Sequence, residues 1–222
     1  MHDDIKRGQQ QRKRVYLEAD LVAVARRVYG APQLRLRVPG QQAAVLAVLG
    51  PQKAEQVIIV LATGSGKTLI VVLAVSIADT GTTILILLLI ALRNDMLRRF
   101  SDVGIQPLVW TPETMRTAPL VIVSVEAACS ERFVEYAQGL VMRQQLCQIF
   151  IDEAHFTVTA SDYRSDMLHL GWHLGQIRTQ TVWLTATLPP ALQDEFIQQN
   201  KLVQPRIVRE STNRANIKYL LS

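Results

Sequence analysis

Seven short runs of apolar residues recur along the chain, and they limit its possible folds more than any other feature. Most are near-continuous Val, Ile and Leu, which is typical of strands covered on both faces. They occupy residues 56–61, 83–88, 105–110, 120–124, 148–152, 181–185 and 205–208. Segments of helical length separate them, at residues 67–78, 91–101, 126–145, 163–174 and 190–200. This alternation predicts an α/β fold with a mostly parallel sheet and helices on both faces.

The chain of 222 residues shows no internal repeat, and no linker-like stretch follows Gly30. We therefore expect one domain at residues 31–222, preceded by a basic, helical segment at residues 1–30. Residues 1–27 are rich in charged side chains and contain no long apolar run, which argues against a signal peptide.

Composition excludes several other classes of protein. With 49% hydrophobic residues and a net charge of +5, the chain is not intrinsically disordered. Two cysteines, Cys129 and Cys147, are too few for a disulfide scaffold and predict buried thiols in a reducing compartment. The expected location is intracellular, and nuclear if the source is eukaryotic. The positive charge is compatible with a polyanionic partner.

Residues 69–92 are so apolar that a membrane helix has to be weighed as an alternative. Asp79 is their only charged residue, but residues 78–83 form a polar break that contains Gly81. A glycine at this place favours the end of a helix. The stretch therefore predicts a buried helix followed by a buried strand, and no membrane partner.

A glycine-rich turn lies between the first apolar run and the helix that follows it. Backbone N–H groups of such a turn can point at phosphate oxygens, and the helix N-terminus adds a partial positive charge. Lys67 can then reach the β- and γ-phosphates of a nucleotide, while the Thr68 hydroxyl can ligate Mg²⁺. The alternative is an ordinary turn, since Leu61 stands where the usual pattern begins with glycine. The predicted phosphate site consists of Thr63, Gly64, Ser65, Gly66, Lys67 and Thr68.

An acidic pair follows the apolar run at residues 148–152. In parallel sheets the carboxyl ends of the strands are where ligands bind. Asp152 can hold Mg²⁺ there, and Glu153 can orient and deprotonate an attacking water. The alternative is a pair that caps the start of a helix. The upstream lysine and threonine favour the catalytic interpretation.

Three segments together resemble motifs I, II and III of superfamily-two DEAD/DEAH-box helicases: residues 63–68, 152–155 and 184–187. Four more resemble RecQ-type helicases in particular: residues 37–41, 89–95, 162–166 and 209–219. The resemblance implies a RecA-like P-loop NTPase domain that binds ATP and Mg²⁺ and acts on nucleic acid, with single-stranded DNA favoured. It also implies a second RecA-like lobe, in the same or another chain, whose arginines stabilise the transferred phosphoryl group. We see no motif of that lobe in these residues.

The same resemblance implies roles for several side chains. Gln41 would read adenine, with Arg37 beside the ring, and His155 would couple the nucleotide site to the nucleic acid. Thr185 and Thr187 would tie motif III to motif II. The alternatives are a surface glutamine on an amphipathic helix, a structural histidine and strand-forming threonines.

Contacts to a nucleic-acid strand are implied for Arg93, Ser124, Phe156 and Arg164. Two departures from the family bear on them. Leu88 replaces a proline at the start of motif Ia, and residues 156–161 form a shortened loop that lacks tryptophan. Aromatic rings stack on bases, so this loop would sense DNA differently, or Phe156 is simply a core residue.

We therefore expect the first motor lobe of a RecQ-like DNA helicase, with weak or absent activity on its own. Two alternatives stay open: a lobe of an RNA helicase, and a nucleotide-binding module without unwinding activity.

Overall fold

The computed structural model describes residues 16–36, 39–78, 81–89, 91, 93–159 and 165–210. Within these ranges the chain forms a seven-stranded parallel sheet of order β3-β4-β2-β5-β6-β1-β7. The strands are β1 (Gln56–Val60), β2 (Thr82–Leu87), β3 (Leu108–Val109), β4 (Leu120–Ser124), β5 (Leu146–Asp152), β6 (Gln180–Thr185) and β7 (Arg206–Arg209).

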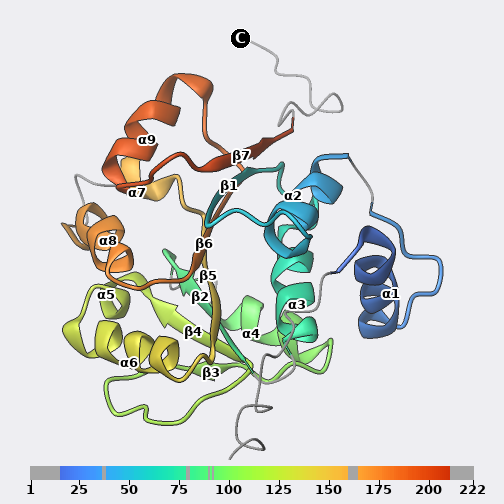
Figure 1. Ribbon diagram of the computed structural model, residues 1–222, viewed down its shortest axis with the longest axis horizontal. Coiled ribbons are helices and arrows are strands. Elements are labelled where there is room, and N and C mark those ends of the chain that lie inside the picture. The colour runs from blue at the N-terminus through green and yellow to red at the C-terminus, as the bar shows by residue number, and fades with distance from the viewer. Residues whose placement is uncertain are drawn as a thin grey trace, which may run out of the picture.

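Helices cover both faces of this sheet. Figure 1 shows α2 and α3 on one side and α5, α6 and α8 on the other. The described helices are α1 (Glu18–Tyr29), α2 (Pro39–Leu49), α3 (Lys67–Ile77), α4 (Arg93–Ser101), α5 (Val125–Ala128), α6 (Glu131–Met142), α7 (Phe156–Thr159), α8 (Ser165–Gly175) and α9 (Gln193–Gln199), with a 3₁₀ turn at Pro190–Leu192. The α/β prediction is confirmed.

The two faces explain why the strands are continuously apolar. Within β1, Val57 and Ile59 join the core under α1–α4, whereas Ile58 and Val60 join the core under α5–α9. Successive strand residues point to opposite faces, so a strand covered on both sides needs an apolar residue at every position.

Three predicted elements differ from those observed. The strand expected at 105–110 shrinks to Leu108–Val109, because β3 is an edge strand with one neighbour and follows Pro107, which has no N–H to donate. The helix expected at 126–145 is split, because the Ser130 hydroxyl accepts from Phe133 N (3.2 Å) and starts α6. The helix at 190–200 begins as a 3₁₀ turn.

The apolar stretch at residues 69–92 contains most of α3 followed by β2, as predicted. Over the described ranges, no helix has both the length and the apolar character needed to cross a membrane. The two cysteines are only half-buried, so the prediction of buried thiols was wrong. Cys129 follows the end of α5, and Cys147 lies near the start of β5, where the side chains are less covered.

Helix α1 lies within the expected N-terminal segment and packs against α3 and α2. Leu21 and Ala25 are fully buried in the same core as α3. The Tyr16 hydroxyl donates to Ile77 O (3.4 Å), and Gln42 Nε2 donates to Glu18 Oε2 (2.5 Å). This packing fixes the loop after α1, which forms part of the site below.

Candidate nucleotide-binding site

The sheet order brings the two predicted motifs to one edge. Strand β1 leads into the glycine-rich turn and β5 leads into the acidic pair, and β6 lies between them. Backbone hydrogen bonds extend past the strand ends: Leu61 N donates to Thr185 O (3.0 Å), and Ala154 N donates to Leu184 O (2.8 Å). Both motifs are therefore held by the end of the same central strand.

The glycine-rich turn is closed by its own hydrogen bonds. Ser65 N and Ser65 Oγ both donate to Ala62 O, at 3.1 and 2.6 Å. Gly64 and Gly66 have φ angles of +81° and +88°, a left-handed conformation that glycine adopts without steric cost. Helix α3 starts directly after Gly66, so its unpaired N–H groups and positive dipole end face the turn.

Lys67 folds back over this turn. Its Nζ donates to Leu61 O (2.9 Å) and Ala62 O (3.3 Å). Burial lowers the pKa of Lys67, and the nearby carboxylates of Glu153 and Asp152 act in the opposite direction. The ammonium group thus lies between the phosphate turn and the acidic pair.

The acidic pair is poorly compensated in the folded chain. Burial, followed by the charge of Glu153, raises the pKa of Asp152 to about 6. A backbone hydrogen bond from Glu153 and the charges of Lys67 and Arg99 oppose this shift. Glu153 itself adopts a left-handed φ of +50°, which is strained for a non-glycine residue. A half-buried carboxylate with a raised pKa at a strained turn is typical of a functional site.

The donor set of this edge fits Mg²⁺. Hard divalent cations take oxygen ligands, and Mg²⁺ commonly uses one or two carboxylates together with substrate phosphates. The Thr68 hydroxyl and the Asp152 carboxylate line the same cavity. No group of three or more His, Cys, Asp or Glu side chains forms a metal site within the described part of the chain. The set fits an ion that the nucleotide helps to hold.

His155 connects the acidic pair to β6. Its Nδ1 lies 3.0 Å from Thr185 Oγ1 and 3.5 Å from Glu153 Oε2. Thr187 N donates to the same Thr185 hydroxyl (3.1 Å). Burial lowers the pKa of His155, which favours the neutral ring. His155 of motif II therefore contacts the Thr185 side chain of motif III, whereas Thr187 contributes its backbone N–H to this network.

A cavity of about 1010 Å³ is lined by both the glycine-rich turn and the acidic pair. Pockets for small ligands span about 300–1,000 Å³, so it has room for a nucleotide. Two of its walls were not foreseen from the sequence. One consists of the end of α1 and the loop after it, and the other belongs to helix α4; their lining residues are Tyr29, Ala31, Gln33, Leu34, Arg35, Leu36, Asp95, Met96 and Arg99.

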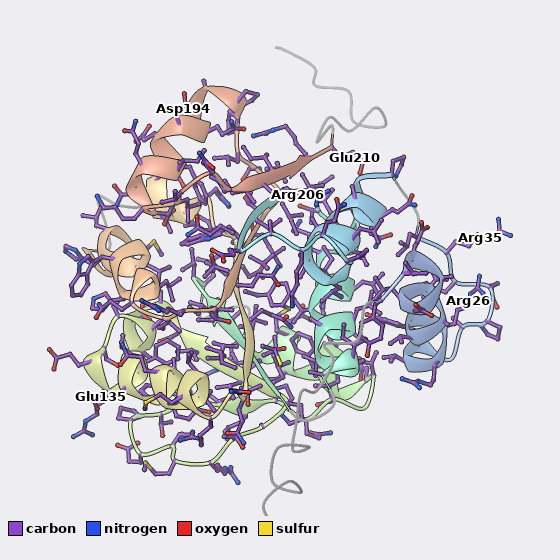
Figure 2. The ribbon with its side chains drawn as sticks, viewed as in Figure 1. Arg26, Arg35, Glu135, Asp194, Arg206 and Glu210 are labelled. Atoms are coloured by element: carbon purple, nitrogen blue, oxygen red, sulfur yellow. The ribbon has the colours of Figure 1, made fainter. Side chains whose placement is uncertain are left out.

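The loop wall depends on local packing. Arg26 Nε donates to Leu34 O (3.0 Å), which ties the loop to α1. Arg35, labelled beside α1 in Figure 2, is exposed. The short apolar pair at Leu34 and Leu36, just before α2, was the available sequence signal for this wall, because such residues can cover a base.

Gln41 lies at the boundary between this wall and the phosphate turn. Its side chain is 3% exposed and lines the cavity, and a Cβ added at Gly66 would overlap Gln41 Nε2. A Cβ at Gly40 would come 2.5 Å from Glu210 Oε2 and 2.9 Å from Leu61 Cδ2, and Figure 2 labels Glu210 at the end of β7 beside α2. Glycines at both places allow α2 to approach the turn closely.

The structure describes three of the four residues expected to touch nucleic acid. Arg93 is exposed at the start of α4, and Phe156 is half-buried with its ring centroid 4.2 Å from that of His155. The Ser124 hydroxyl accepts from Ala127 N (3.3 Å) and caps α5. Arg164 lies outside the described residues, as do Arg37 and most of the segments at 162–166 and 209–219.

Comparisons with known proteins agree with this geometry. The profile of the DEAD/DEAH box helicase family matches residues 38–195. Mouse ATP-dependent DNA helicase Q5 is 29% identical over 186 residues, which are 76% of this chain and 19% of that protein. RecQ-like DNA helicase BLM of Xenopus laevis is 33% identical over 103 residues, which are 45% of this chain and 8% of that protein. The chain thus spans about a fifth or less of the length of these relatives.

Solved structures support the fold. DUF1998 helicase MrfA bound to DNA has a TM-score of 0.63 at 18% identity, covering 89% of this chain and 30% of that one. S. cerevisiae Dbp5 bound to RNA and ADP BeF3 has a TM-score of 0.63 at 14% identity, covering 93% of this chain and 53% of that one. The chain belongs to the DEAD/DEAH box helicase family, and its described residues form one RecA-like domain.

Proposed function

We propose that this domain is the ATP-binding motor lobe of a RecQ-like DNA helicase. When a second lobe completes it, the domain couples hydrolysis of Mg·ATP to movement along single-stranded DNA. One observation carries the proposal: Lys67, Asp152 and Glu153 line a single cavity at the carboxyl edge of the sheet. DNA is favoured over RNA because helicase Q5 and BLM, its sequence relatives, are both named as DNA helicases.

The nucleotide phosphates would occupy the turn at 63–66. Backbone N–H groups at the start of α3 and the Lys67 ammonium would bind their oxygens. The Thr68 hydroxyl and Asp152 would hold Mg²⁺, which neutralises charge that develops on the phosphates. The loop wall would enclose the base, with Gln41 donating and accepting at its edge.

Glu153 would orient and deprotonate the attacking water, since it lies next to the Asp152 position in the same cavity. His155 and Thr185 would pass changes at Glu153 to β6 through the contacts described above. Thr187, which is exposed just beyond, would relay them toward bound nucleic acid. Arg93 and Phe156 stay candidates for that contact.

Hydrolysis by residues 1–222 alone should be slow. The lobe would lack arginines from the second lobe, and such an arginine is worth about a thousandfold or more in rate. Adding a second lobe in trans should raise the ATPase rate and make it depend on DNA.

Titration of residues 1–222 with Mg·ATP tests the nucleotide site. Wild-type protein should bind, and Lys67→Ala should lose about tenfold to hundredfold in affinity, the worth of one charge-assisted hydrogen bond. Lys53→Ala is the matched control, because Lys53 lines a different cavity, which lies near the amino edge of the sheet. A folded wild-type protein without affinity for ATP, or equal affinity in both variants, would disprove the assignment. Competition between single-stranded DNA and RNA at one stated salt concentration tests the substrate.

A further inference from the structure

Helix α4 presents two neighbouring arginines to different surroundings. Met96 and Phe100 form its buried stripe, 7% and 0% exposed, in the core shared with α3. At about 100° per residue, Arg99 lies roughly 60° from Met96 around the helix, whereas Arg98 lies roughly 160° from it. Arg99 therefore flanks the buried stripe, and Arg98 faces solvent. Side-chain exposures of 56% for Arg99 and 73% for Arg98 agree with this geometry.

Both arginines share a single carboxylate. Arg98 Nη2 lies 2.7 Å from Asp95 Oδ1, and Arg99 Nη2 lies 2.7 Å from Asp95 Oδ2. The two guanidinium groups lower the pKa of Asp95, so this carboxylate is ionised near neutral pH. Asp95 thus has two positively charged partners, so one ion pair remains if either arginine moves away.

Only one of the two arginines lines the nucleotide cavity. Arg99, Met96 and Asp95 of α4 line this cavity together with the turn at 63–66 and Asp152. Arg98, which also belongs to the described part of the chain, does not line it. Arg99 therefore shares one cavity with the turn and with Lys67 at the N-terminus of α3.

We infer that Arg99 binds the phosphates of the nucleotide, exchanging its ion pair with Asp95 for phosphate oxygens while Arg98 continues to neutralise Asp95. The inference rests on the proposed binding of ATP. The planar guanidinium fork matches phosphate oxygens and can bind two of them at once. The ion pair that it leaves is exposed and therefore weak. The first lobe would then supply an arginine of its own to the nucleotide, from outside the glycine-rich turn.

The same phosphate chemistry could come from the backbone of a nucleic acid. The shared cavity favours the nucleotide, because Lys67 and the phosphate turn line it as well. Arg98, which is more exposed, is the better placed of the two for a strand that runs across the surface.

Affinities for Mg·ATP, ADP and adenosine should be measured for wild-type residues 1–222, Arg99→Ala and Arg98→Ala, and binding of single-stranded DNA should be measured for the same proteins at one stated salt concentration. We expect Arg99→Ala to weaken the binding of ATP and ADP about tenfold, the size of one lost charge-assisted contact, and to leave the binding of adenosine unchanged. Arg98→Ala removes an equal charge and an equal Asp95 pair, so it should change each of these three affinities less than twofold. Arg99→Lys should restore part of the loss, because the charge returns without the fork.

Equal effects of the two alanine variants would overturn the inference, since they would reflect net charge alone. It would also be overturned if Arg99→Ala weakened the binding of single-stranded DNA but not that of nucleotide, because Arg99 would then contact the DNA strand. If wild-type protein bound no nucleotide, the proposed function would fail first. Thermal unfolding of both variants should match wild type, because both side chains are exposed.

Discussion

The two edges of the sheet carry different kinds of buried polar group. At the carboxyl edge the half-buried groups are ionisable. Burial lowers the pKa of Lys67 and His155 and raises that of Asp152, which in each case favours the neutral form. At the amino edge the buried groups are neutral amides whose nitrogens donate within the protein, although the Gln180 Oε1 atom is buried without a hydrogen-bond partner among the described residues. Gln148 Nε2 donates to Thr83 Oγ1 (2.9 Å), and Gln180 Nε2 donates to Ala54 O (2.6 Å).

The amino edge also borders a cavity, of about 630 Å³, so a cavity alone does not mark the functional end. A neutral amide loses little on burial once it is hydrogen-bonded, whereas a charged group stays costly until a counter-charge arrives. The contrast predicts that changes at the amino edge alter stability only. Changes at the carboxyl edge should alter ligand affinity, and some should even stabilise the empty domain.

The largest effect on stability is expected from Gly171→Ala near the amino edge. A Cβ at Gly171, in α8, would come 2.5 Å from Asn200 O and 2.6 Å from Asn200 Cα. Backbone cannot yield as a flexible side chain does, so the free energy of unfolding should fall by about 2–3 kcal/mol. Urea unfolding measures this change, and affinity for Mg·ATP should stay as in wild type.

Gly175→Ala is the matched control for that change. Gly175 ends the same helix, and a Cβ there would meet nothing within 4 Å. It should be neutral or slightly stabilising. If the two variants were equally stable, the close approach of α8 to Asn200 would be wrong.

A stabilising effect is expected from Asp152→Asn at the carboxyl edge. The folded pKa of about 6 exceeds the ordinary value of 3.8, so the folded state binds the proton more tightly. Asp152 therefore favours folding below about pH 4, and this contribution is lost as pH rises through 6. At pH 7 Asp152→Asn should raise the free energy of unfolding by about 2 kcal/mol, and at pH 4 it should match wild type.

Asp95→Asn serves as the comparison, because the pKa of Asp95 is shifted in the opposite direction from that of Asp152. Its hydrogen bonds to Arg98 and Arg99 lower the pKa of Asp95, so its contribution to stability is present above the ordinary pKa and is lost in acid. This variant should not be more stable than wild type at pH 7. Equal stabilisation by Asp152→Asn and Asp95→Asn would point to net charge. It would contradict the contrast between a carboxylate whose pKa burial raises and one whose pKa its arginine partners lower.

The smallest effect is expected for the polar pair at the amino edge. Gln148→Leu leaves the buried Thr83 hydroxyl without its partner and should lower the free energy of unfolding by about 1 kcal/mol. Thr83→Val added to Gln148→Leu should cost less than the two single changes summed. Strict additivity in this double-mutant cycle would show that the hydrogen bond contributes nothing.

Much of the fold was predictable because most strands are covered on both faces. The strand expected at 120–124 has the observed bounds of β4, and those at 56–61, 83–88 and 181–185 are within one residue of the observed bounds. The polar residue that caps a helix was harder to identify from the sequence. Ser130 looked like one more helical residue, and only the observed cap shows that it begins a new helix.

The site was predictable where its residues are neighbours in sequence. The turn at 63–68 and the pair Asp152 and Glu153 each carry their chemistry within a few residues. Arg99 and the loop wall carry no such pattern, because tertiary packing brings them to the cavity: α1 packs against α3 and α2, and α4 shares the core of these helices. The adenine role of Gln41 stays a prediction, although its burial against Gly66 places it at the right wall.

Because β6 lies between β1 and β5, the sheet sets the distance between the ends of these two strands. Neighbouring strands lie about 4.8 Å apart, so the ends of β1 and β5 are about 9.6 Å apart. Backbone hydrogen bonds set that interval, not the side chains beneath it. Substitutions in the core should therefore change the stability of the domain while leaving the distance between Lys67 and the Asp152 carboxylate nearly constant. The length of the ligand that fits between them would then depend on the one strand, β6, that separates β1 from β5.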